Sequence, residues 1–127
     1  MNAGLRTPLK DVRGLGSARA GTRHFIVQRT TAIALVPLSL WFVWLALSLV
    51  HLDYVAARAL IAQPCNAVLM IAFLVAGFWH AQLGVQVVIE DYVHGSLEMV
   101  FQLLVKLLAA LGALVGVLAV VRIALGS

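Results

Sequence analysis

Residues 67–89 read AVLMIAFLVAGFWHAQLGVQVVI, a stretch without Asp, Glu, Lys or Arg. It lies within a longer charge-free interval between Arg58 and Glu90. An apolar stretch of about 20 residues is what a helix needs to cross roughly 30 Å of hydrocarbon, at a rise of about 1.5 Å per residue. The sequence therefore predicts a transmembrane helix over residues 67–89.

Two further apolar stretches have the same property. No charged residue occurs between Arg29 and Asp53. Between Glu98 and Arg122, only Lys106 interrupts the apolar sequence. We therefore predict an all-α integral membrane protein with three transmembrane helices, at about 30–51, 67–89 and 99–121.

The composition supports a membrane protein of one domain over residues 1–127. Of the 127 residues, 63% are hydrophobic and 11% are charged, and a soluble domain of this size could not bury so much apolar surface. Cys65 is the only cysteine, which excludes an internal disulfide and a paired-cysteine metal site. We expect it to be a small buried apolar side chain.

The basic residues are concentrated before the first span. The net charge is +4, but we expect no nucleic-acid partner, because the basic residues do not spread over a soluble face. By the positive-inside rule, the arm 1–29 is predicted to be cytoplasmic, or in the matrix if the protein is mitochondrial, and three spans then place the C-terminus in the periplasm. Glycines and Pro8 favour an irregular conformation over residues 1–22. The basic residues of the arm are Arg6, Lys10, Arg13, Arg19, Arg23 and Arg29.

Three features modify this simple pattern. Pro37 in the first span predicts a kink. The segment Tyr54 to Ile61 is predicted to form a short interfacial helix. Gly112 and Gly116 form a GxxxG pattern in the third span, which allows another helix to approach closely and so indicates a packing partner.

His80 is the most informative polar residue at membrane depth. It lies about 15 Å from the inner end of its span, which is close to mid-membrane, and polar groups there are usually retained for a reason. Gly77 and Gly84 lie on the same helical face and leave it without side chains. A bare face with an imidazole fits a flat macrocycle such as haem, although a closely packed helix or a histidine that only hydrogen-bonds to its neighbours is also compatible with it.

The remaining histidines, His24, His51 and His94, lie near the ends of the spans. If His80 is one of two histidine ligands of a haem, the second is therefore expected from a partner chain. Such a shared haem distinguishes a membrane anchor from a self-contained cytochrome b.

A second polar cluster ends the same span. Asp91 lies eleven residues after His80, which brings it to within about 20° of the same helical face. Tyr92 at the membrane boundary is commonly an aromatic-belt residue; the alternative is that its hydroxyl donates a hydrogen bond to a bound polar head group, with Asp91 and His94 able to relay protons. Gln82 and Gln86 are predicted to hydrogen-bond to a neighbouring helix.

Two segments together resemble a known family. Residues 14–35 read GLGSARAGTRHFIVQRTTAIAL and residues 80–94 read HAQLGVQVVIEDYVH. They resemble the smaller of the two hydrophobic membrane anchors of succinate dehydrogenase (complex II), of the alphaproteobacterial and mitochondrial-like type. The spacing His-x10-Asp-Tyr is the more specific part of the resemblance, which extends over nearly everything after residue 13.

The resemblance implies a function for each of these residues. His80 corresponds to an axial ligand of a haem b shared with the larger, cytochrome b-type anchor, and Arg29 to an arginine near the haem propionates. Tyr92 and Asp91 correspond to residues of the ubiquinone site. The sequence around Arg23 and His24 departs from some relatives, which leaves their role open, as it is for His94. Lys106 is given no chemistry.

The resemblance also implies partners. Electrons from succinate pass through the flavoprotein and the iron–sulfur protein of the complex, which dock on the cytoplasmic or matrix face, and reach the quinone that this chain helps to hold. The chain alone has no flavin motif and no set of cysteines for iron–sulfur clusters, so it is expected to be a subunit of succinate:ubiquinone oxidoreductase without catalysis of its own. The alternatives are the anchor of a fumarate reductase and a small transporter or assembly protein in which His80 and Asp91 form a proton path.

Overall fold

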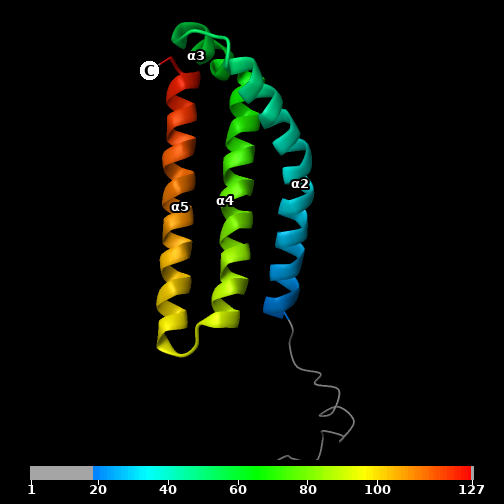
Figure 1. The fold of residues 1–127 in the computed structure, drawn as a ribbon, viewed down its shortest axis with the longest axis vertical. Coiled ribbons are helices and arrows are strands. Elements are labelled where there is room, and N and C mark those ends of the chain that lie inside the picture. The colour runs from blue at the N-terminus through cyan, green and yellow to red at the C-terminus, as the bar shows by residue number, and fades with distance from the viewer. Residues whose placement is uncertain (1–18, 127) are drawn as a thin grey trace, which may run out of the picture.

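The computed structural model describes residues 19–126, and the regular structure in this range is entirely helical (Figure 1). Helices α2, α4 and α5 are long and apolar enough to cross a membrane. The predicted fold class, all-α with three long apolar helices, is confirmed. The elements are α2 (Arg19–Leu49), α3 (Tyr54–Ala62), α4 (Pro64–Tyr92) and α5 (Ser96–Ala124).

The three long helices extend beyond most of the predicted span ends. Helix α2 begins at Arg19, so the prediction that residues 1–22 are irregular is wrong for their last part; residues 1–18 lie outside the described residues. Helix α4 likewise includes the acidic residues at its end and stops at Tyr92. The physical reason is that helical hydrogen bonds continue past the hydrocarbon boundary, whereas hydropathy reports only the part of a helix that lies inside it.

The short helix α3 forms as predicted. Its N-cap residue, Asp53, accepts a hydrogen bond from the Ala56 backbone amide at 2.8 Å, which satisfies one of the free donors at the start of the helix. The junction with α4 is fixed by the buried Asn66, whose Nδ2 donates to the Leu60 carbonyl at 2.9 Å and to Gln63 Oε1 at 3.3 Å. Asn66 therefore fixes the corner between α3 and α4.

Helix α4 lies between α2 and α5 (Figure 1). Toward α2, the rings of Phe42 and Phe73 stack with centroids 4.6 Å apart, and Leu45 is fully buried. Helix α2 runs without interruption through Pro37 and curves along its length in Figure 1. Contacts between α2 and α4 thus place residues of the first span beside those of the second.

The contact between α4 and α5 depends on the GxxxG pattern. A Cβ atom built at Gly112 would lie 2.6 Å from Phe78 Cε1, and one at Gly116 would lie 3.0 Å from Leu74 Cδ1. The helix that approaches this pattern is therefore α4 of the same chain. Because glycine has no side chain, α4 and α5 can come close together at these two positions.

This contact leads to a first prediction. Gly112→Val is expected to lower the stability of the bundle by about 1–3 kcal/mol, because the added methyl groups overlap the ring of Phe78. Thermal unfolding of the purified protein in detergent measures the change. Ala119→Val, at an exposed position of the same helix, is the matched control, and equal midpoints for the two variants would contradict the assigned contact.

Most apolar surface of the long helices faces outward. Only 6% of the most apolar window of each candidate span is buried inside the chain. The large exposed side chains include Leu104, Leu107, Leu111, Leu114 and Leu118 of α5. Such a surface is stable in contact with lipid or with other transmembrane helices, not with water.

Candidate functional site

His80 lies in the middle part of α4 and contacts α2. Its Nδ1 is 3.1 Å from Oγ1 of Thr31, a residue 49 positions earlier in the chain. Both side chains are partly buried. The His80 side chain is thus held by Thr31 of α2, through a hydrogen bond that the sequence did not predict.

The Thr31 hydroxyl also contacts its own helix. Oγ1 is 2.9 Å from the Val27 carbonyl oxygen and 3.0 Å from that of Gln28. The second nitrogen of His80, Nε2, has no hydrogen-bond partner among residues 21–126, a range in which the only fully buried and unpartnered side-chain atom is His24 Nε2. Nε2 of His80 therefore keeps accessible surface.

The glycines on the His80 face border open space. A Cβ atom built at Gly77 or at Gly84 would meet nothing within 4 Å. This differs from Gly112 and Gly116, which another helix of the chain approaches closely. Of the three explanations given for this face, one, a closely packed helix, is thus not supplied by residues 19–126.

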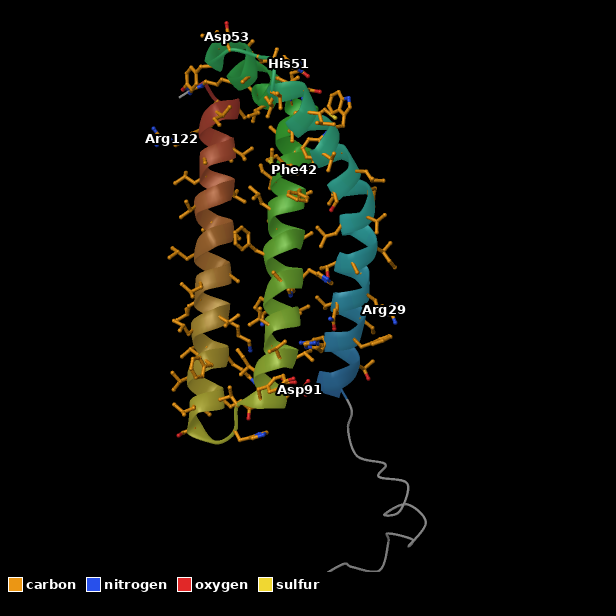
Figure 2. The ribbon with its side chains drawn as sticks, viewed as in Figure 1. Arg29, Phe42, His51, Asp53, Asp91 and Arg122 are labelled. Atoms are coloured by element: carbon orange, nitrogen blue, oxygen red, sulfur yellow. The ribbon has the colours of Figure 1, made fainter. Side chains whose placement is uncertain are left out.

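Arg29 and His24 differ in their surroundings. Arg29 is exposed, with its guanidinium carbon 5.3 Å from the centroid of the Phe25 ring, and Figure 2 shows it on the side of α2 away from α4. His24 is partly buried and its Nε2 is fully buried without a partner among the described residues. The structure therefore brings Thr31, and not Arg29, to His80.

The second cluster lies at the C-terminal end of α4. Asp91 and Tyr92 are both exposed, Tyr92 with 82% of its surface accessible, and Figure 2 shows Asp91 at this end of the helix. The helix closes with a hydrogen bond from the Val93 amide to the Ile89 carbonyl at 2.8 Å. Gly95, with φ of 76°, then turns the chain into α5. Asp91 and Tyr92 thus share one unbroken helix with His80, and Tyr92 lies about 18 Å along it from the histidine.

Gln82 and Gln86 were predicted to hydrogen-bond to a neighbouring helix; among residues 19–126 they bond instead within α4. Gln82 Nε2 donates to Gln86 Oε1 at 3.1 Å, and Gln86 Nε2 donates to Glu90 Oε1 at 2.9 Å. Side chains four residues apart on a helix are close enough to satisfy one another in this way. These three side chains form a row of hydrogen bonds along α4 that ends at Glu90, close to the C-terminal end of the helix.

Lys106 and Cys65 are two further residues considered from the sequence. Lys106 lines a pocket of about 270 Å³ between α4 and α5 together with Trp79 and Gln82. Cys65, expected to be buried, is exposed at the start of α4, because the chain there has just left the α3 corner. Within residues 19–126, no group of three or more His, Cys, Asp or Glu side chains could hold a metal ion.

Comparison with known proteins identifies the family of this chain. Residues 4–121 match the family model described as succinate dehydrogenase/fumarate reductase transmembrane subunit. The chain is 34% identical over 93 residues to a succinate dehydrogenase hydrophobic membrane anchor subunit of Rickettsia bellii, a match that covers 73% of this chain and 74% of that protein.

Two further relatives carry the same description. The protein of Paracoccus denitrificans is 31% identical over 90 residues, with 71% of this chain and 70% of that protein covered. The protein of Rickettsia conorii is 35% identical over 79 residues, with 61% and 63% covered. The chain is therefore a multi-pass membrane protein that belongs to the succinate dehydrogenase/fumarate reductase transmembrane subunit family.

Proposed function

We propose that this chain is the membrane anchor of a succinate dehydrogenase, and that it helps to hold a haem b at His80 and ubiquinone at Tyr92 and Asp91. The observation that carries the proposal is the state of His80. Its Nδ1 contacts Thr31, while Nε2 is unpartnered among the described residues and accessible. An imidazole in this state at membrane depth is ready to act as a ligand.

The residues around His80 fit a haem. The open space at Gly77 and Gly84 leaves the same face of α4 clear over nearly two helical turns. His24 Nε2, buried and unpartnered among the described residues, is a polar atom that a haem propionate could satisfy. Arg29 lies on the side of α2 away from α4, and its place near the propionates is proposed from the family resemblance alone. When bound, the haem would supply a one-electron carrier.

The second haem ligand is proposed to come from the larger, cytochrome b-type anchor of the same complex. The outward apolar faces of the long helices provide surface for such a partner. The arrangement in which two membrane anchors pack around one haem thus uses the face of α4 that carries His80.

The quinone site is proposed at the inner end of α4. The Tyr92 hydroxyl donates a hydrogen bond to a quinone carbonyl oxygen, and the Asp91 side chain orients the site and relays protons from water to the quinone as it is reduced. Both side chains are exposed in this chain, which fits a site that is completed by the iron–sulfur protein of the complex, itself bound to the flavoprotein. Electrons from succinate then reach the quinone at this end of the anchor.

The orientation follows from the charge distribution. We expect the start of α2 on the cytoplasmic side, because the arm before the first span is rich in arginine, and the end of α5 in the periplasm. Reporter fusions after residue 127 and within the 93–95 connection test this, with a periplasmic and a cytoplasmic signal expected respectively. The same signal from both fusions would contradict the three-span topology.

The experiment that tests the whole proposal is a reduced-minus-oxidised absorption spectrum of the purified membrane complex, with succinate as reductant. A haem b signal together with succinate-driven ubiquinone reduction supports the proposal, and the descriptions of the relatives favour this direction. A complex that instead couples quinol oxidation to fumarate reduction would be a fumarate reductase. Absence of both pigment and electron transfer would favour a transporter or assembly protein.

A further inference from the structure

Thr31, in the first span, lies within hydrogen-bonding distance of the His80 side chain. Its hydroxyl oxygen lies near three potential acceptors: the Val27 carbonyl at 2.9 Å, the Gln28 carbonyl at 3.0 Å and His80 Nδ1 at 3.1 Å. A hydroxyl has a single proton to donate, so the direction of that proton decides the tautomer of the histidine.

The geometry favours one direction. If the hydroxyl proton pointed at Nδ1, the lone pairs of Oγ1 would face two carbonyl oxygens at 3.0 Å or less without a proton between them, which is repulsive. If the proton points between the carbonyls, Oγ1 can accept from a protonated Nδ1 of His80. This second arrangement satisfies all four atoms.

The tautomer of His80 determines whether its other ring nitrogen, Nε2, carries a lone pair. A neutral imidazole protonated at Nδ1 has its lone pair on Nε2, and Nε2 of His80 has no hydrogen-bond partner among residues 21–126 and keeps accessible surface. Histidine ligands of metals are usually held in this way, with the distal N–H donated to a fixed acceptor that sets both the tautomer and the ring plane.

We infer that Thr31 is a positioning residue: it holds His80 as the Nδ1–H tautomer and fixes the orientation of the imidazole toward the haem iron. The inference rests on the proposed haem ligation by His80. It assigns to α2 a direct part in the haem site, in addition to its contacts with α4. Because the hydroxyl is anchored to the backbone of α2, movement of that helix relative to α4 also turns the ligand.

The test compares three variants in the assembled complex. Thr31→Val keeps the branched shape and removes the hydroxyl, whereas Thr31→Ser keeps the hydroxyl. Thr30→Val is the matched control, because Thr30 Oγ1 contacts only the Ile26 carbonyl of its own helix, at 2.8 Å, among the described residues. Thr31→Ala, which is smaller and cannot clash with His80, repeats the measurement if the valine variant assembles poorly.

Two readouts besides enzyme activity are used. The first is the rate of haem transfer from the purified complex to excess apomyoglobin, expected to rise about tenfold in Thr31→Val and Thr31→Ala. The second is the electron paramagnetic resonance spectrum of the ferric haem, whose g values depend on the ligand planes and should change in these variants alone. Thr31→Ser should restore both toward wild type.

The possible results distinguish the positioning role of Thr31 from haem ligation by His80. A wild-type complex without haem overturns both. A wild-type complex with haem, whose release rate and spectrum are unchanged in Thr31→Val and Thr31→Ala, overturns the positioning role and leaves ligation by His80 intact. Equal changes in Thr30→Val also overturn it, since they would reflect a general perturbation of α2.

Discussion

His80→Ala is expected to remove the haem b signal from the assembled complex, with at least about tenfold less haem bound per complex than in wild type. The substitution deletes the only described mid-span imidazole of α4 and its lone pair on Nε2. It retains the apolar length of the helix, so membrane insertion should be unchanged. Haem content is measured from the reduced-minus-oxidised spectrum of the purified complex, normalised to protein.

The matched control is His51→Ala. His51 is exposed in the connection between α2 and α3, at the opposite end of the bundle from Asp91 (Figure 2). The same chemical change there should leave the haem spectrum as in wild type. A full haem spectrum with unchanged axial ligation in His80→Ala would refute the assignment of this residue as a ligand.

Tyr92→Phe is expected to slow quinone reduction by roughly tenfold to hundredfold. The substitution keeps the ring and removes only the hydroxyl, so an aromatic-belt residue would tolerate it. Losing a positioned hydrogen bond to the quinone costs about 1–3 kcal/mol, which corresponds to this change in rate. The measurement is succinate-driven ubiquinone reduction by the assembled complex.

Two controls make this result specific. Succinate oxidation with an artificial acceptor that takes electrons before the quinone should remain near the wild-type rate, because the soluble proteins of the complex are unaltered. Tyr54→Phe removes the other tyrosine hydroxyl of the chain, which accepts a hydrogen bond from Arg58 at the start of α3, and should leave quinone reduction unchanged. If Tyr92→Phe also matches wild type, Tyr92 is a belt residue and the quinone is held by other groups.

The sequence was sufficient to predict the elements of the fold, because membrane insertion depends on local composition. Apolar stretches, two without any charge and the third interrupted only by Lys106, predicted all three long helices. Helix α3, predicted over Tyr54 to Ile61, is found over Tyr54–Ala62. The ends of the helices could not be predicted as well from the sequence. Arg19 and the acidic end of α4 continue the helical hydrogen bonding in a region where hydropathy no longer reports it.

Contacts between helices could not be predicted in the same way. The GxxxG pattern indicates a close approach but does not say which helix approaches, and only the structure identifies Phe78 and Leu74 of α4. Gln82 and Gln86 illustrate the opposite case, since their spacing of four already allowed the bond that they form with each other.

Thr31 was missed for a similar reason. A threonine in a membrane helix commonly bonds the carbonyl four residues earlier, as Thr30 does, so its residue type and position give no sign of a second role. Thr31 and His80 lie on neighbouring helices that run in opposite directions (Figure 1). The register between two such helices, which depends on the length of α3 and its corners, decides whether the two side chains meet.

The unbroken course of α4 from His80 to Tyr92 has a consequence for how such chains change in evolution. One residue inserted between the two would rotate Tyr92 by about 100° around the helix axis and shift it about 1.5 Å relative to His80. A change of length in the 50–53 connection leaves the position of Tyr92 relative to His80 unchanged. Insertions and deletions should therefore accumulate outside the segment 80–92. The number of residues between the histidine and the Asp-Tyr pair should then be constant, and it can be used to align distant members of the family.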